Sequence, residues 1–198
     1  MGAHGGFAMN VHTTLRSLLV ATALSSACSA PGSSSNTTEN PGADDSALDD
    51  GQLIAIYNQV NTFDIETGAL AVERAHSDEV RALGRMVTTD HTAVKANAEA
   101  LAATLGVDVV LPPGRDAAED EHQAALERMQ SLSGEAFDRA YLDHEVAFHT
   151  AAIAAVKDVL IPAAEHDELV DFMTEVLPGF EHHLAETIRV REALGYAE

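Results

Sequence analysis

Residues 64–91, DIETGALAVERAHSDEVRALGRMVTTDH, decide the fold, because they contain the end of one helix and the start of the next. Ser77, followed by Asp78 and Glu79, is typical of a helix start. The hydroxyl can cap free N–H groups, and acids in the first turn favour the positive end of the helix. Apolar residues recur at helical spacing on both sides of Ser77. The stretch therefore predicts two antiparallel helices joined by a tight turn.

Outward from this turn, capping residues, glycines and prolines predict four long helices and a short one. Ser133 is expected to cap the fourth helix and Pro162 to end it, and Pro178 should kink the last one. The predicted helices cover about residues 49–75, 78–105, 117–132, 135–161 and 165–195. Two hairpins joined by a crossing segment predict an all-α, ferritin-like four-helix bundle whose crossover carries a short extra helix.

The N-terminal part has the layout of a secretory signal. Arg16 precedes an apolar run over residues 18–24, which is too short to span a bilayer, and small residues follow. We therefore assign residues 1–27 to a signal peptide. The only cysteine, Cys28, ends the string ALSSAC, which resembles a bacterial lipobox, so Cys28 is expected to be acylated; cleavage after Ala27 by the ordinary signal peptidase is the alternative.

Residues 28–48 are rich in Ser, Pro, Gly, Asn and Asp, a composition that predicts a flexible tether to a domain over residues 49–198. Acylated Cys28 would hold this domain near a membrane. Ser29 after the cysteine would, by resemblance to other lipoproteins, permit outer-membrane sorting. The expected location is the periplasm or the periplasmic face of the outer membrane.

Charge and motifs exclude several function classes. The formal net charge of -21, without a basic cluster, makes nucleic acid and anionic membrane surfaces poor partners. No nucleophile motif, phosphate-binding loop or dinucleotide fingerprint is present. Enzymatic activity is therefore not the favoured reading. Oxidase or peroxidase chemistry at a di-metal centre is the least favoured possibility, because it needs bridging carboxylates from several helices.

Ionisable side chains lie on or beside the apolar stripe of each long helix, near mid-length. Buried groups of this kind cost several kcal/mol unless they are paired or share a cation. Glu145 and His149 form an i, i+4 pair on one face. The candidate metal ligands are Asp64, Asp90, His91, Glu145, His149 and His183.

The heights of these residues agree within each hairpin. Asp64 lies 12 residues before His76 and Asp90 lies 13 after Ser77, so at about 1.5 Å per residue they are level. Glu145 and His183 are likewise level in the second hairpin. Whether the two levels coincide depends on how the hairpins dock. Nitrogen and oxygen donors without a thiolate suit Fe, Mn, Zn or Cu, while a purely structural polar network is the alternative.

The other histidines are expected to be solvated on polar faces. They are His76, His122, His144, His166 and His182.

The strings DIETGALAVERA, RMVTTDH, FDRAYLDHEVAFH and LPGFEHHL resemble the bacterial secreted family called domain of unknown function four-one-four-two, whose members are often labelled outer-membrane proteins. The resemblance covers about residues 50–195. It implies a ferritin-like bundle behind a signal or lipoprotein peptide. Asp90 with His91 matches the family's Asp-His, His149 and His183 match its helix-centre histidines, and Asp64 stands where Glu is typical.

Two functional hypotheses follow. The first is an exported, lipid-anchored bundle that binds a transition metal, for metal handling or envelope stress protection. The second is a non-catalytic envelope module whose buried polar residues only fix helix packing.

Overall fold

The computed structural model describes residues 47–196, and within them the chain is helical without strands, so the predicted all-α class is confirmed. The signal peptide, Cys28 and the tether up to residue 46 lie outside the described residues. The helices are α1 (Asp50–Arg74), α2 (Asp78–Leu105), α3 (Asp116–Gln130), α4 (Glu135–Ala155), α5 (Ile161–Ala163) and α6 (Asp167–Ala193), with a π-helical segment, η2 (Val156–Leu160), between α4 and α5.

The hairpin of α1 and α2 forms as predicted. Ser77 Oγ accepts from Val80 N–H at 3.1 Å and so caps α2. The two helices approach closely at Gly68 and Gly84. A Cβ at Gly68 would lie 2.6 Å from Thr88 Oγ1, and one at Gly84 would lie 2.7 Å from the Gly68 carbonyl oxygen. Only glycine fits at these two positions, so they bring the two backbones together.

The second hairpin differs from the prediction in two details. Gly134, with φ 62°, precedes α4 and no side chain caps the helix, so the role given to Ser133 was wrong. Pro162 does not end the helix, which continues to Ala163. Ile161 N–H donates to the Val156 carbonyl five residues back, in the π pattern. A proline ring clashes with the carbonyl four residues back in a regular α-helix, and the wider π turn precedes it here.

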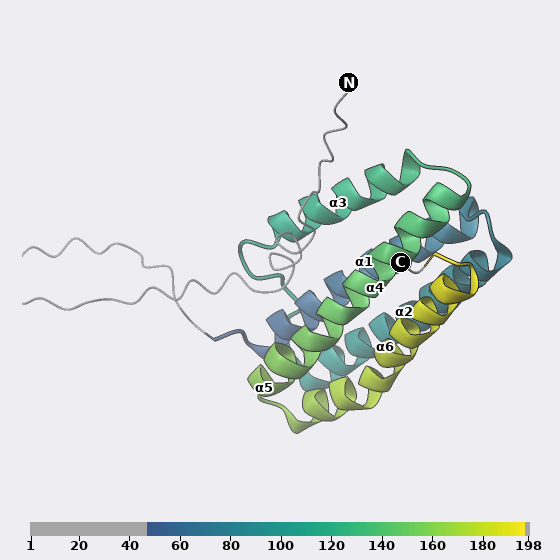
Figure 1. Ribbon diagram of the computed structural model, residues 1–198. Coiled ribbons are helices and arrows are strands. Elements are labelled where there is room, and N and C mark those ends of the chain that lie inside the picture. Colours follow the sequence, from purple (N-terminus) through teal and green to yellow (C-terminus); the bar gives the residue numbers. More distant parts are fainter. Residues whose placement is uncertain (1–46, 197–198) are drawn as a thin grey trace, which may run out of the picture.

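The four long helices lie side by side, with α3 along the outside (Figure 1). Each packs on two others: α1 on α2 and α4, and α6 on α4 and α2. The crossover helix α3 contacts α1 and α4. Helix α6 is continuous through Pro178. The ferritin-like class of this arrangement stays a prediction.

The interior holds two apolar clusters with a polar layer between them. The first includes Leu53, Tyr57 and Phe63 of α1 and reaches Leu160 and Leu169 at one end of the domain. The second includes Leu70 and Ala71 of α1, Val80 and Leu83 of α2, Phe137 and Tyr141 of α4, and Val190 of α6. Buried polar side chains lie between the clusters on all four long helices: Asn61, Asp64 and Thr67; His91; Glu145 and His149; His183 and Thr187.

One stretch, Glu135–Ala163, is long and apolar enough to cross a membrane by length and composition. In the domain it packs against other helices, because α4 contacts α1, α3 and α6. It also carries Glu145 and His149, which have no exposed surface. The buried apolar residues of this stretch, among them Phe137, Leu142 and Phe148, therefore belong to the interior of this domain.

Two buried aspartates connect the hairpins at opposite ends. Asp138, at the start of α4, accepts from His76 and Ser77 N–H in the α1–α2 turn, both at 2.8 Å. Asp50, at the start of α1, accepts from Glu165 and His166 N–H before α6, both at 2.9 Å. Each carboxylate pairs with orphan N–H groups near a helix start in the other hairpin. The two aspartates therefore hold the hairpins at a fixed relative height.

Candidate metal centre

Five of the six predicted residues meet in the polar layer, and each is at most 3% exposed: Asp64, His91, Glu145, His149 and His183. They come from all four long helices, two of them from α4. The levels of the two hairpins, which the sequence left open, therefore coincide. Whether these residues bind a metal stays a prediction.

His91 has one ring nitrogen held by α1. Its Nδ1 lies 2.8 Å from Asn61 Oδ1. The Asn61 amide is oriented because its Nδ2 donates to the Tyr57 carbonyl at 2.8 Å. Since Oδ1 can only accept, His91 Nδ1 carries the N–H. In the neutral ring, Nε2 then carries a lone pair and no proton. This nitrogen lies 2.8 Å from Asp64 Oδ2.

His183 is held in the same way by Asp90. His183 Nε2 lies 3.0 Å from Asp90 Oδ2, a carboxylate oxygen that accepts the N–H. Its other nitrogen, Nδ1, shares a hydrogen bond of 3.1 Å with His91 Nε2, which needs a proton on one of the two rings. Asp90, also predicted as a ligand, does not reach the buried centre: its side chain is 52% exposed and contacts the outer nitrogen of His183. It is one residue, or about 100° of helix, from the inward-facing His91.

His149 completes the pattern from α4. Its Nδ1 donates to the Glu145 backbone carbonyl one turn back, at 3.1 Å. Its Nε2 lies 3.3 Å from Asp64 Oδ2 and has no hydrogen-bond partner among the described residues. All three imidazoles therefore have one nitrogen fixed by an acceptor and direct the other toward the same place.

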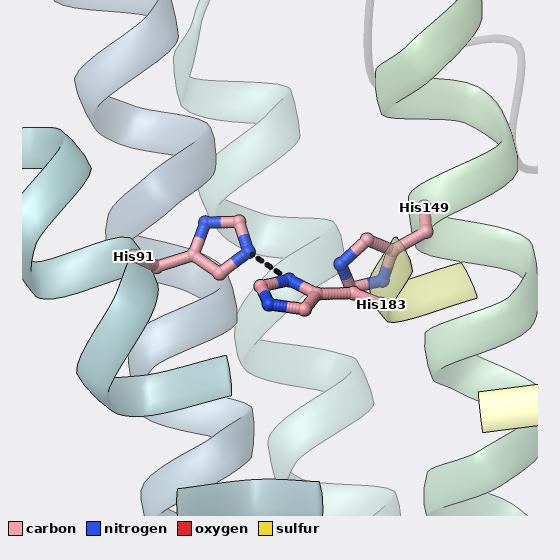
Figure 2. A group of neighbouring side chains, drawn as sticks. All are labelled: His91, His149 and His183. Carbon is pink, nitrogen blue, oxygen red and sulfur yellow. Dashed lines mark hydrogen bonds between the residues drawn. The ribbon is translucent and has the colours of Figure 1, made fainter. Parts of the chain in front are cut away.

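Figure 2 shows the three rings meeting in the interior. One ring nitrogen of each lies within 4.8 Å of those of the other two. Asp64 Oδ2 contacts two of them. Three imidazole nitrogens and one carboxylate oxygen are a donor set that first-row transition metals accept, and the acceptors that hold the outer nitrogens are the usual surroundings of metal-binding histidines.

Glu145 lies on the carboxylate side of the centre. Its Oε1 accepts from Thr67 Oγ1 at 3.2 Å, and its Oε2 is 3.5 Å from His149 Nδ1. Glu145, Asp64 and His149 each offer an atom within 4.8 Å of the others, so they form a second group that shares His149 with the first. The layer therefore offers five donors around a small volume.

Burial and mutual charge set the protonation of this layer. Burial lowers the pKa of His149 and of His183, so both favour their neutral forms. Burial also opposes ionisation of Asp64, but His149 and His91 outweigh it and lower the pKa of Asp64. Burial, together with the charge of Asp64, raises the pKa of Glu145 well above its usual range. A bound metal ion would replace the protons that favour ionised Asp64, because ligating imidazoles are neutral and a ligating carboxylate is ionised.

Several atoms of the polar layer lack a partner with hydrogen-bond geometry. Four atoms at the centre, Asp64 Oδ1, Asp64 Oδ2, Glu145 Oε2 and His149 Nε2, have no hydrogen-bond partner among the described residues. Asp64 Oδ2 lies close to His91 Nε2 but without hydrogen-bond geometry. An unpaired buried polar atom costs about 1–3 kcal/mol. This concentration marks a place for a cation or for water.

Sequence reasoning missed Asn61 and Thr67, which orient His91 and Glu145. Both lie three residues from Asp64 on the same face of α1, and that spacing is the signal that could have found them. Two histidines read as solvated were also misassigned. His122 is 3% exposed and stacks on Phe63 with ring centroids 4.2 Å apart. His144 Nε2 is buried without a hydrogen-bond partner among the described residues.

The chain belongs to the family described as "Domain of unknown function (DUF4142)", whose sequence profile matches residues 34–190. This confirms the resemblance seen in the sequence. No curated protein matches the chain. Among solved structures, the chain is similar to the crystal structure of a DUF305 fragment from Deinococcus radiodurans, with a TM-score of 0.61 and 17% identity, over 71% of this chain and 93% of that one. That likeness supports the helical fold alone.

Proposed function

We propose that this protein binds a transition-metal ion with His91, His149, His183 and Asp64, and that Glu145 lies beside the ion. One observation carries the proposal: three buried imidazoles with fixed outer nitrogens direct their other nitrogens toward one place, next to the unpaired Asp64 Oδ2. Lone pairs crowded in this way repel one another unless a proton or a cation lies between them. The predominance of imidazole favours Zn, Cu or Fe over Mn.

The rival is a polar network that only fixes helix packing. Such a network is stable when every member is hydrogen-bonded. Here Asp50 and Asp138 already connect the hairpins with satisfied oxygens. The central residues add unpaired atoms instead. Metal binding accounts for both the convergence and the unpaired atoms, so we favour it.

The test is elemental analysis of the protein purified without a metal-affinity tag, together with melting curves in the presence of Zn²⁺, Cu²⁺ or Fe²⁺. We expect near-stoichiometric metal, and a raised melting temperature because an ion that binds only the folded state stabilises it. His183→Ala should abolish both effects. Its matched control is His182→Ala, the exposed neighbour on the same helix.

A protein that is metal-free, and whose melting temperature none of these ions changes, would leave the packing network as the better explanation. Equal metal content in the His182 and His183 variants would also contradict the proposed ligands.

We further propose that the domain is ferritin-like in arrangement and is exported and anchored through acylated Cys28, at the outer membrane or in the periplasm. The support is the signal-like residues 1–27 and the string ALSSAC, all outside the described residues. Metal handling or protection against envelope stress would be the role of such a protein. Cys28→Ser should release the protein from membranes, and a variant that stays membrane-bound would overturn the anchoring.

A further inference from the structure

We infer that a pocket between α2 and α6 is the route by which a divalent cation reaches and leaves the centre, which makes the proposed site an exchange site. This inference rests on the proposed function. The pocket has a volume of about 320 Å³. His91 and His183 are among its lining residues, so it reaches two of the proposed ligands from outside.

Among the described residues, the pocket gives the centre an open side between α2 and α6. Asp64, Glu145 and His149 have no exposed surface, whereas His183 keeps 3%. A second cavity, near Val156 and Leu160, has an apolar lining and includes none of the proposed ligands. An ion that enters between α2 and α6 would meet His91 and His183 first.

The ionisable groups that line the pocket, apart from the two histidines, are acidic. They are Asp90 of α2 and Glu175 of α6. The walls between them include Val94, Val176 and Phe180, which bind cations poorly. Asp90 has a special place, because its half-exposed carboxylate also accepts from His183 Nε2 at 3.0 Å. A cation attracted to Asp90 at the rim would therefore lie next to His183, a proposed ligand.

Gly179 keeps the α6 side of the pocket open. A Cβ built at Gly179 meets no atom within 4 Å, whereas those at Gly68 and Gly84 meet packed atoms at 2.6 and 2.7 Å. Gly179 lies inside α6, where most residues have a higher helix propensity than glycine. A larger side chain at this position can therefore fill the pocket without disturbing the packing.

The experiment mixes metal-free protein with Co²⁺ in a stopped-flow instrument, follows the visible absorbance of the bound ion, and measures release with excess EDTA. Gly179→Met should slow association and dissociation together by about tenfold, as an obstructed route does, and leave the equilibrium Kd unchanged. Ala93→Met, on the α2 side of the pocket, should do the same. The matched control is Ala185→Met, on the exposed surface of α6 outside the pocket.

Charge at the rim is tested separately. Glu175→Gln should slow association about twofold to threefold at low ionic strength and hardly at all in high salt, because exposed charges are screened. The control is Glu192→Gln, an exposed residue of α6 outside the pocket.

The outcomes separate this inference from the proposed function. If the unmodified protein binds Co²⁺ while both methionine variants keep its rates, the ion uses another route and the inference is overturned, although the site stands. If the unmodified protein does not bind Co²⁺, Zn²⁺, Cu²⁺ or Fe²⁺, the proposed function itself fails. Loss of affinity in Gly179→Met with an unchanged association rate would also contradict an access role.

Discussion

The buried carboxylates at the two ends of the helical domain differ from those at its centre in what their oxygens contact. Asp50 and Asp138 accept from backbone N–H groups through both oxygens. Asp64 has no hydrogen-bond partner for either oxygen among the described residues, and Glu145 has none for Oε2. Equal burial therefore accompanies two different surroundings: the end carboxylates hold the hairpins together, whereas the central ones keep unpaired oxygens and are the proposed ligands of a metal ion.

The largest effect on stability should come from substituting one of the end carboxylates. Asp138→Asn replaces one accepting oxygen by an NH₂ group that faces a backbone N–H. Because a bond to the charged carboxylate contributes about 1.5 kcal/mol and the buried N–H left unpaired costs about as much again, the free energy of unfolding should fall by about 3 kcal/mol. Urea denaturation measures this. Asp143→Asn, at an exposed ion pair with Arg191, should cost well under 1 kcal/mol. Equal losses in the two variants would contradict the role of Asp138.

The next largest effect on stability should come from binding of Zn²⁺ at the proposed site. Zn²⁺ at about 100 times its Kd should raise the free energy of unfolding by about 2.7 kcal/mol. Asp138→Asn should lower the free energy of unfolding but keep the gain from Zn²⁺, because Asp138 lies far from the centre along α4. Asp64→Asn should lose it. Calorimetry with and without Zn²⁺ measures both, and an increment retained by Asp64→Asn would remove Asp64 from the ligand set.

A smaller effect, of opposite sign to that of Asp138→Asn, is expected at Glu145. Burial and Asp64 raise the pKa of Glu145 above its usual 4.5. The folded protein therefore holds this proton more tightly, and the resulting stability is present below pH 4.5 and lost as pH rises through the raised pKa. In metal-free protein at pH 7 or above, Glu145→Gln should be at least as stable as the unmodified chain. Urea denaturation across pH measures it, and a large loss would mean a satisfied carboxylate.

At pH 7 the smallest effect concerns a histidine outside the ligand set. Burial lowers the pKa of His144 from 6.5 to about 4. The unfolded chain takes up this proton at higher pH than the folded protein, so stability falls as pH drops from 6.5 toward 4. His144→Gln should flatten that fall, whereas His76→Gln, at an exposed position, should not. Melting temperatures across this range provide the comparison.

Local signals in the sequence predicted the helices well. Ser77 caps α2, as the sequence indicated. Asp49 caps α1, and the left-handed Gly106 follows α2. These features depend on neighbours within a few residues. The end of the fourth predicted helix was less predictable, because a π turn allows the helix to continue past Pro162.

Contacts between distant segments could not be read in this way. Asp138 was only an acid in the first turn of a helix, yet its partners lie 61 and 62 residues away. His122 is buried because the crossover helix packs on Phe63. The central residues were found because helical spacing brings them to the apolar stripe. Helical spacing alone did not show that Asp90 lies beside the stripe and reaches His183 from outside.

The division of the donors between the two halves of the chain has a consequence for assembly. Asp64 and His91 belong to the first hairpin, and His149 and His183 to the second. Neither hairpin alone holds more than two of the four proposed ligands, and chelation by two groups is weaker than by four. With the proposed ligands divided in this way, a newly made chain would bind metal firmly only once its two halves have docked. The metal content of a preparation would then report the fraction of correctly assembled molecules.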